Sequence, residues 1–492
     1  MYKVLFVTGE AHPFAKTGGL GDVCGSLPPA LQRLGHDVRL LLPAYPYAKR
    51  AAGANLRAIA QIQLPFAPTP ATVLEGTLPG SRVVAWLLDH PPAFDREGHP
   101  YIDDAGRPWP DNAQRFALLG YAAAVLAQAR AGLDWRPDIV HCHDWQAGLI
   151  PALLSLSDTR PAAVFTIHNL AYQGLFPGET FVALGLSRTL WSMHALEFHG
   201  QLSFIKGGIV FAERVNTVSP TYAREIQTPA YGYGLDGLLR HRAERVSGIL
   251  NGIDVAEWDP SCDRYITQPY SAQSLTDKRA NKRALQERLG LATDRERPLI
   301  GMIGRLVEQK GFDLALAAWP TLAHHDVQMA LLGSGEPAHE RSLAALADEY
   351  PGRVAVQFGF DEPLAHLIEA GADLFLMPSR FEPCGLNQMY SLRYGTLPIV
   401  HNVGGLADTV VDINAETLAA GTANGVVFQD ASVTALTNAV QRALRLYADS
   451  ATWARVLATG MAQDFSWDKS AREYSALYER AVADARAVGV LR

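Results

Sequence analysis

Cysteine and long apolar segments are both scarce in this chain of 492 residues. No two cysteines form a CxxC pair, which argues against a zinc knuckle or a disulfide framework, so we expect a reducing, cytoplasmic location. The longest apolar run, residues 116–127, is well short of the roughly 20 residues that a membrane-spanning helix needs. The apolar run Val4–Val7 near the N-terminus is too short for a signal-peptide core. The four cysteines are Cys24, Cys142, Cys262 and Cys384.

Charged residues are also few, at 19% of the chain against a usual share of about 25%. There are 43 Lys and Arg against 50 Asp and Glu, and the resulting formal charge of -7 argues against a general attraction to nucleic acid or anionic membrane. The hydrophobic share of 48% can fill a large core. At roughly 150 residues per domain, the length predicts about three domains, or two large ones.

Short apolar runs alternate with longer segments of helical period, which predicts an α/β fold with two doubly wound, Rossmann-like sheets. The strand-like Ser247–Leu250 runs into the turn dipeptide Asn251-Gly252, so we divide the chain into domains 1–248 and 249–465. Open parallel sheets bind ligands beyond the carboxyl ends of their strands, and we therefore expect a ligand in a cleft between the domains. The predicted strands are 3–8, 37–42, 138–142, 162–168 and 213–219, then 299–304, 327–333, 354–360, 372–378 and 397–400.

A glycine loop, residues 16–22, precedes the first predicted helix. Its backbone N–H groups, the positive end of the helix dipole and the charge of Lys16 favour a phosphate. Asp22 is the predicted N-cap of this helix and Gly35 its predicted end. The glycines also resemble a dinucleotide-binding fingerprint, although the loop starts well after the strand instead of directly after it. A glycine turn with a solvated lysine is the alternative interpretation.

Histidines stand at the ends of two predicted strands. His141 and His143 share one face of the first strand and could bind a metal together, but no further cluster at ligand spacing supports one. We favour Asp144 and Trp145 as the start of the next helix, offering a carboxylate and an aromatic platform to a sugar ring. His168 ends the second strand. It either faces the cleft or is a buried core histidine whose ring nitrogens have hydrogen-bond partners.

Two cations, Arg305 and Lys310, follow the first strand of the second domain. A guanidinium fork and a point charge at the start of a helix can neutralise a departing diphosphate. The alternative is a solvated loop with two surface cations. Both residues are therefore candidates for stabilising a leaving group.

Residues 379–388 lie between a predicted strand and a helix that ends at Gly395. Backbone N–H groups around Gly385 and Leu386 would point at a phosphate, and Glu382 can accept hydrogen bonds from hydroxyls. Cys384 could be a nucleophile, but no activating base stands nearby in the sequence, so we interpret it as a packing or contact residue.

Together these motifs closely resemble those of bacterial glycogen synthases and starch synthases, retaining glycosyltransferases of the GT-B fold. The resemblance extends in order from Lys3 to about Trp467. The residues that carry it are Lys16-Thr17-Gly18-Gly19-Leu20, His143-Asp144-Trp145, Ile167-His168-Asn169, Asn251-Gly252, Gly304-Arg305, Lys310-Gly311 and Glu382-Pro383-Cys384-Gly385-Leu386.

The resemblance implies retaining transfer of glucose from ADP-glucose to the non-reducing 4-hydroxyl of an α-1,4-glucan, with no metal or other cofactor. It also implies that the last helix, about 466–492, completes the first domain. Glu382, His168, Arg305 and Lys310 would be catalytic. The implied donor-binding residues are Lys16, Gly18, Gly19, Asp22, Asn251, Arg305, Lys310, Phe360, Cys384, Gly385 and Leu386, and the implied acceptor or sugar contacts are Asp144, Trp145, His168 and Tyr101.

Two positions depart from related patterns. Tyr390 stands eight residues after Glu382, where many retaining GT-B enzymes carry a second glutamate, and glycogen synthases generally share this departure. Phe360 stands where similar enzymes often carry a tyrosine; its ring can still stack on a nucleotide base, but the hydroxyl is lost. The departure at Tyr390 favours the synthase branch, whereas the one at Phe360 leaves the base preference open.

Several functional alternatives stay open at this stage. Within the same fold the donor could be UDP-glucose, or the product could be maltose 1-phosphate. Outside the family the candidates are a pyridoxal-dependent glucan phosphorylase and a non-catalytic glucan-binding protein. No loop nominates a carboxylate nucleophile, so we expect a front-side displacement in which the leaving phosphate takes the acceptor's proton.

Overall fold

The computed structural model describes residues 1–491, which form two compact units. The first comprises Met1–Gly252 and the last helix from Trp467 onward, and the second comprises Ile253–Ser466. None of the helices in residues 1–491 combines the length and hydrophobicity that a bilayer crossing requires.

The first unit is built on a nine-stranded sheet in the order β12-β11-β7-β6-β1-β2-β5-β4-β3. The strands from β12 to β5 are parallel, whereas β4 runs antiparallel to both of its neighbours. The Pro- and Ala-containing segment 50–110 thus extends the sheet. The strands are β1 Lys3–Val7, β2 Asp37–Pro43, β3 Arg57–Ile62, β4 Ala71–Thr77, β5 Val84–Asp89, β6 Ile139–His143, β7 Ala162–Ile167, β11 Arg214–Thr217 and β12 Val246–Gly248.

Helices and a small three-stranded sheet complete the first unit. The sheet has the order β8-β10-β9, with β8 Leu175–Pro177, β9 Glu197–Phe198 and β10 Gln201–Ser203. The helices are α1 Gly19–Arg33, α2 Pro46–Ala52, α3 Pro91–Phe94, α4 Asn112–Ala127, α5 Leu149–Leu154, α6 Gly178–Ala183, α7 Phe204–Phe211, α8 Pro220–Glu225, α9 Asp236–His241 and α19 Trp467–Ala487.

Helix α1 begins earlier than predicted. Its N-cap is Gly18, so Asp22 lies inside the first turn, and the prediction of Asp22 as N-cap is wrong. Acidic groups stabilise this position as well, because the first turn carries the positive end of the helix dipole. The end of the helix agrees with expectation: Gly35, which follows the C-cap residue Leu34, adopts φ +91°, a conformation that favours glycine.

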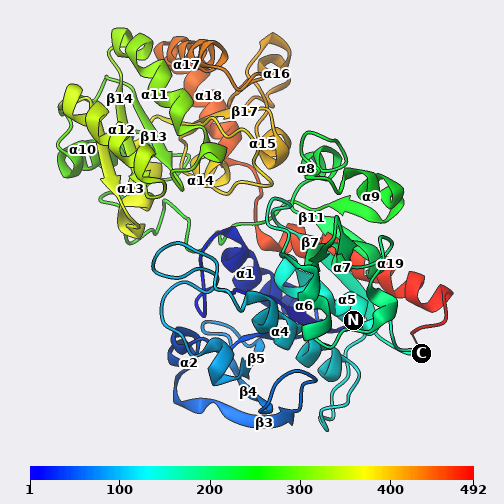
Figure 1. The fold of residues 1–492 in the computed structure, drawn as a ribbon. Helices are drawn as coiled ribbons and strands as arrows, with labels where there is room; N and C mark the ends of the chain where they lie inside the picture. Colours follow the sequence, from blue (N-terminus) through cyan, green and yellow to red (C-terminus); the bar gives the residue numbers. More distant parts are fainter. Residues whose placement is uncertain (492) are drawn as a thin grey trace. The chain divides into compact units, whose positions relative to one another are not determined.

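The last helix, α19, packs against α1, β7 and β11 of the first unit (Figure 1, red). Trp467, Tyr474, Leu477 and Tyr478 are all at most 5% exposed, as their helical spacing predicts for one buried face. The Tyr478 hydroxyl lies 2.8 Å from Nδ1 of His141 on β6. Helix α19 therefore belongs to the core of the first unit.

The second unit contains a six-stranded parallel sheet in the order β15-β14-β13-β16-β17-β18. Alternate residues supply two cores, since Ile300 and Met302 join one hydrophobic cluster while Leu299 joins the other. This arrangement is the predicted doubly wound sheet. The strands are β13 Leu299–Ile303, β14 Gln328–Gly333, β15 Val354–Phe358, β16 Leu374–Met377, β17 Leu397–His401 and β18 Val426–Phe428.

Helices cover both faces of this second sheet. Trp319 of α11 and Val440 of α17 belong to the first cluster, and Leu285 of α10 and Ile368 of α13 belong to the second. The helices are α10 Lys278–Leu289, α11 Phe312–Leu322, α12 Pro337–Glu349, α13 Glu362–Gly371, α14 Asn387–Arg393, α15 Gly404–Thr409, α16 Ala415–Ala420, α17 Val433–Ala448 and α18 Ser450–Met461.

Candidate active site

A buried glutamate, Glu10, holds the glycine loop of the first unit. It is 2% exposed, and its carboxylate accepts hydrogen bonds from the Thr17 backbone N–H at 2.5 Å and from the Thr17 hydroxyl at 2.7 Å. The Tyr101 hydroxyl donates a further bond at 2.8 Å. Burial raises the pKa of the Glu10 carboxyl, against the lowering effect of these bonds. Sequence reasoning missed Glu10, because nothing in the local pattern marks it.

Lys16 and Asp22 form an ion pair, with Lys16 Nζ 2.7 Å from Asp22 Oδ1. Both side chains are partly exposed. A Cβ added at Gly25 would lie 2.4 Å from the His12 carbonyl oxygen, so only glycine lets the segment that precedes the loop pack this closely on α1. Gly18 and Gly19, in contrast, have open space where a Cβ would stand, which leaves their backbone approachable.

Asp144, at the end of β6, adopts a strained backbone with φ +53° and ψ -172°. A non-glycine residue rarely adopts this conformation, and such strain concentrates at functional sites. Its Oδ1 accepts a hydrogen bond of 2.6 Å from the His168 backbone N–H. Burial raises the pKa of the Asp144 carboxyl from its ordinary 3.8 to about 7. The predicted helix start is present as a short 3-10 turn, Trp145–Ala147.

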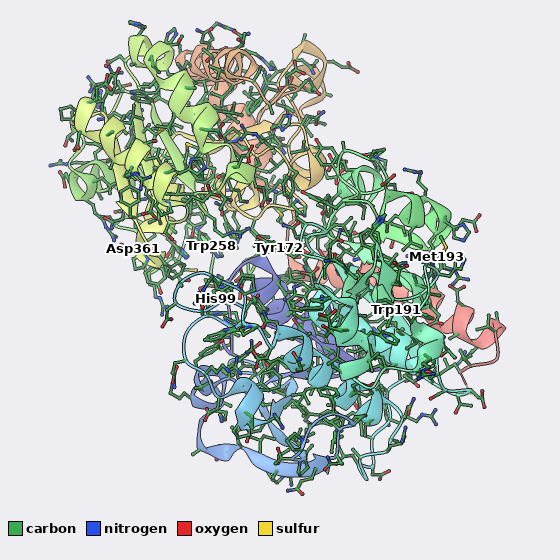
Figure 2. All side chains as sticks on the ribbon, in the orientation of Figure 1. His99, Tyr172, Trp191, Met193, Trp258 and Asp361 are labelled. Carbon is green, nitrogen blue, oxygen red and sulfur yellow. The ribbon has the colours of Figure 1, made fainter. Side chains whose placement is uncertain are left out.

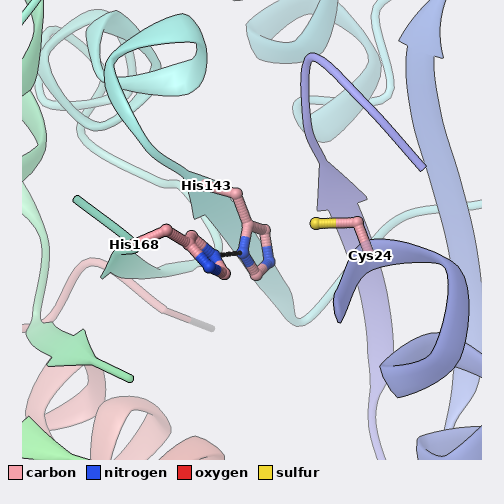
Figure 3. Close-up of side chains that lie close together, drawn as sticks. All are labelled: Cys24, His143 and His168. Atoms are coloured by element: carbon pink, nitrogen blue, oxygen red, sulfur yellow. Dashed lines mark hydrogen bonds between the residues drawn. The ribbon is translucent and has the colours of Figure 1, made fainter. Parts of the chain in front are cut away.

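Three buried side chains, Cys24, His143 and His168, lie close together (Figure 3). His143 Nδ1 and His168 Nε2 share a hydrogen bond of 2.9 Å. Burial lowers the pKa of the His168 imidazole to about 3, so the ring is neutral at pH 7. His141 does not join them: its ring nitrogens lie 2.8 Å from the Tyr478 hydroxyl and 2.7 Å from the Thr166 hydroxyl. The His-x-His pair thus has separate hydrogen-bond partners.

The predicted sugar contacts Trp145 and Tyr101 lie in an aromatic cluster. The Trp145 ring centroid is 4.8 Å from that of Phe116 and 6.2 Å from that of Tyr101. The Tyr101 hydroxyl is bonded to Glu10, so this side chain supports the glycine loop. Asn251 is 6% exposed, and within residues 1–491 its Oδ1 has no hydrogen-bond partner.

In the second unit, Lys310 and Glu382 are brought together. Lys310 Nζ lies 2.5 Å from Glu382 Oε2, and the Ser379 hydroxyl donates to the same oxygen at 3.0 Å. The Lys310 side chain is 22% exposed and that of Glu382 7%. Lys310, the residue predicted to bind phosphate, and Glu382, the residue predicted to bind glucose, therefore form an ion pair in this structure.

Two loops are docked on each other to create this contact. Gly311 adopts φ +69°, and a Cβ there would lie 2.1 Å from the Pro378 carbonyl oxygen, so glycine is required. Arg380 also pairs with Asp313 at 2.6 Å. Arg305 is exposed on the loop after β13. The contacts of Gly311 and Arg380 hold the segment after β13 against the segment after β16.

A second glycine pair, Gly404-Gly405, supports the Glu382 loop. The Gly405 backbone N–H donates to the Glu382 carbonyl at 3.1 Å, and a Cβ at Gly405 would lie 2.1 Å from the Cys384 carbonyl oxygen. The order Gly-Gly-Leu-x-Asp opens α15 here and α1 in the first unit. Sequence reasoning missed Gly404-Gly405, although this repetition was a signal that could have found it.

The remaining predicted donor contacts lie on loops of the second unit. Cys384 is 4% exposed, Gly385 adopts φ +73°, and Leu386 is the N-cap of α14. Phe360, two residues after β15, is 81% exposed, so its ring is open for stacking. Two clusters in residues 1–491 have the geometry to hold a metal: Cys24, His143 and His168, and Glu257, Glu362 and His366.

Comparison with known proteins identifies the family. Residues 3–241 match the starch synthase catalytic domain and residues 285–455 match glycosyl transferases group 1. Glycogen synthase 1 of Methylococcus capsulatus is 58% identical over 482 residues, which cover 98% of this chain and 97% of that protein. The chain belongs to the glycogen synthase family. The glycogen synthase of Thioalkalivibrio sulfidiphilus is 55% identical over 98% of this chain and 100% of its own length.

Solved structures agree with this membership. The catalytic domain of starch synthase IV from Arabidopsis thaliana, bound to ADP and acarbose, matches with a TM-score of 0.87 and 35% identity, over 98% of this chain and 99% of that one. Sucrose-phosphate synthase from Thermosynechococcus elongatus shares the fold, with a TM-score of 0.60 and 19% identity over 98% of this chain and 100% of that one. The predicted GT-B fold class, family and glycosyltransferase activity are confirmed.

Proposed function

We propose that this member of the glycogen synthase family transfers glucose from ADP-glucose to the non-reducing 4-hydroxyl of an α-1,4-glucan, with retention. The observation that carries the proposal is the Lys310–Glu382 pair, a cation and a carboxylate held together at the ends of two neighbouring parallel strands. A second support is the similar catalytic domain of starch synthase IV from Arabidopsis thaliana, whose structure contains ADP and acarbose. Four free cysteines are consistent with a cytoplasmic location.

Lys310 and Glu382 have complementary roles in this proposal. Lys310 binds the donor diphosphate, and Glu382 accepts hydrogen bonds from glucose hydroxyls. In the free enzyme each neutralises the other, so Glu382, with its side chain 7% exposed, is not left as an unpaired buried charge. When the donor binds, its phosphates compete with Glu382 for the ammonium group of Lys310. The glucose hydroxyls then donate hydrogen bonds to Glu382 and replace the contact that it loses.

Charge stabilisation at the leaving group drives the chemical step. The bond between C1 of glucose and the β-phosphate oxygen breaks as C1 bonds to the acceptor oxygen on the same face. The departing phosphate takes the acceptor's proton. Arg305 and Lys310 stabilise the negative charge that develops on the diphosphate, and no metal or cofactor is required.

His168 and Lys16 position the donor from the first unit. Because the pKa of His168 is lowered to about 3, its ring is a neutral hydrogen-bonding group that orients the sugar. Lys16 pairs with Asp22 in this structure. In the proposal its ammonium group binds the sugar nucleotide. Asp144 fixes the His168 backbone, and so determines where the imidazole stands.

The test compares glucan growth from ADP-glucose and from UDP-glucose, each with glycogen as acceptor and a chelator present. Wild type and Glu382→Gln are assayed beside Glu308→Gln, an exposed glutamate in the same turn as Lys310. We expect growth from ADP-glucose that falls at least about 100-fold in Glu382→Gln and is unchanged in Glu308→Gln.

Other outcomes decide among the alternatives. Faster growth from UDP-glucose would reassign the donor, and activity only with glucose 1-phosphate as acceptor would indicate a maltose 1-phosphate product. Growth from glucose 1-phosphate as donor, together with a bound pyridoxal chromophore, would indicate a phosphorylase. Glucan binding without turnover of any donor would overturn the proposal.

A further inference from the structure

Outside the residues assigned to catalysis, three metal-ligating side chains converge in the second unit. One ligand atom each from Glu257, Glu362 and His366 lies within 4.8 Å of the other two. Glu362 and His366 are one turn apart on α13, a spacing that places both on the same helix face. Glu257 comes from a segment far away in the sequence. The cluster therefore connects the start of the second unit to α13.

His366 is oriented as metal-binding histidines are. Its Nδ1 lies 2.8 Å from Asp263 Oδ2, and the Tyr394 hydroxyl donates to the same oxygen at 2.6 Å. Against the effect of burial, these two hydrogen bonds lower the pKa of the Asp263 carboxyl. A carboxylate on one ring nitrogen fixes the tautomer and leaves the other nitrogen as a ligand.

The second ring nitrogen of His366 has no hydrogen-bond partner in the described part of the chain. The side chain is completely buried, and within residues 1–491 its Nε2 has no hydrogen bond. A buried polar atom without a partner is rare in folded proteins and calls for an explanation such as a bound ion. This atom, rather than the two carboxylates, points to a ligand.

The cluster is open to solvent on its acidic side. Glu257 is exposed, Glu362 is half-buried and His366 is buried, so an ion can enter past the carboxylates.

We propose that Glu257, Glu362 and His366 bind a divalent transition-metal ion, with Zn²⁺ as the best match to one imidazole and two carboxylates. Imidazole nitrogen suits zinc and its neighbours in the periodic table, whereas Ca²⁺ and Mg²⁺ prefer oxygen ligands alone. Water would complete the coordination. The site serves no step of the glucosyl transfer.

The ion would act as a clamp within the second unit. Trp258, next to Glu257, stacks on His366 with 3.7 Å between ring centroids and on Tyr390 with 3.8 Å (Figure 2 labels Trp258). Tyr390 lies on α14, the helix that follows the Glu382 loop. A metal on His366 therefore fixes Trp258 between α13 and α14.

The site is tested by titrating the chelator-treated full-length protein with Zn²⁺ in a calorimeter, which measures the affinity and the number of ions bound. The exposed thiol of Cys262 is removed first as Cys262→Ser, so that it cannot bind zinc adventitiously. In this background we expect one ion per chain, because in the other cluster His143 and His168 already share a hydrogen bond. Glu257→Gln and Glu362→Gln should each weaken binding at least tenfold, and Glu416→Gln, an exposed control on α16, should not.

Two further measurements separate the site from general surface binding. Asp263→Asn, which alters the group that orients His366 and leaves all three proposed ligands in place, should weaken binding about 10- to 100-fold. Ni²⁺ should quench tryptophan fluorescence in the wild type, and Trp258→Phe should keep the binding but lose most of the quenching.

Any of three results would overturn the proposal. They are an absence of binding in the Cys262→Ser background, binding that Glu362→Gln leaves intact, and quenching by Ni²⁺ that persists in Trp258→Phe. A circular dichroism spectrum that matches the wild type must accompany each variant. Binding is measured directly, so failure of this proposal leaves the glucosyltransferase proposal standing, and the reverse also holds.

Discussion

The raised pKa of Asp144 predicts that Asp144→Asn stabilises the protein while it impairs catalysis. In the unfolded chain this carboxyl ionises near 3.8, but in the folded protein it keeps its proton to about pH 7. Between these values the folded state binds more protons than the unfolded state, so the stability of the wild type falls as the pH rises. Asn carries no charge at any pH, so the variant does not lose stability in this way as the pH rises.

The magnitude follows from the size of the shift. A rise from 3.8 to about 7, at about 1.4 kcal/mol per unit, corresponds to about 4 kcal/mol above pH 7 as an upper bound. Asn keeps an oxygen that accepts the 2.6 Å hydrogen bond from the His168 backbone, and it tolerates a positive φ as well as Asp does. No new strain should therefore offset the gain.

The assay is thermal unfolding of wild type, Asp144→Asn and the exposed-site control Asp158→Asn from pH 5 to pH 8. We expect Asp144→Asn to unfold at increasingly higher temperatures than the wild type as the pH rises, with a constant difference above pH 7. Glucosyl transfer should fall at all pH values. Parallel pH profiles for the wild type and Asp144→Asn would refute the reasoning, as would a variant that is less stable at pH 8.

Three further predictions concern buried contacts. Glu10→Ala removes the acceptor that holds the glycine loop, and the KM for ADP-glucose should rise more than kcat falls in steady-state assays. In Gly405→Ala the new methyl group meets a backbone oxygen 2.1 Å away, so thermal unfolding should show a loss of about 1–3 kcal/mol. Arg160→Ala leaves Glu213 buried without its 2.7 Å partner and should cost about 3–5 kcal/mol in denaturant unfolding. The matched surface change Arg57→Ala should cost about 0–1 kcal/mol, and equal losses for the two would contradict the argument.

Local rules explain most of what could be predicted from the sequence. The parallel strands were recognisable because both faces are buried, which makes them short apolar runs such as Ala162–Ile167. Glycine with positive φ ends helices as expected at Gly35 and Gly395. The predicted N-cap of α1 is wrong because Gly18 begins the helix without a side-chain hydrogen bond, so no capping side chain marks the position.

What the sequence could not predict depends on contacts between distant segments. Glu10 is paired across 91 residues with Tyr101, and Lys310 across 72 residues with Glu382. No period or spacing encodes such pairs, because the loops that carry them meet only when their strands join one sheet. His366 shows the same limit, since Asp263 that orients it is 103 residues away.

The sequence by itself determined the family, the alternation of strands and helices, and the loops where the chemistry is proposed, since each depends on residues close together in the chain. Only the tertiary structure decided that Lys310 faces Glu382 and that Tyr101 supports the glycine loop. It also decided that Asp144 is buried enough to hold a proton near neutral pH. Charge pairing and desolvation depend on distances through space, and those exist only once the sheets have assembled.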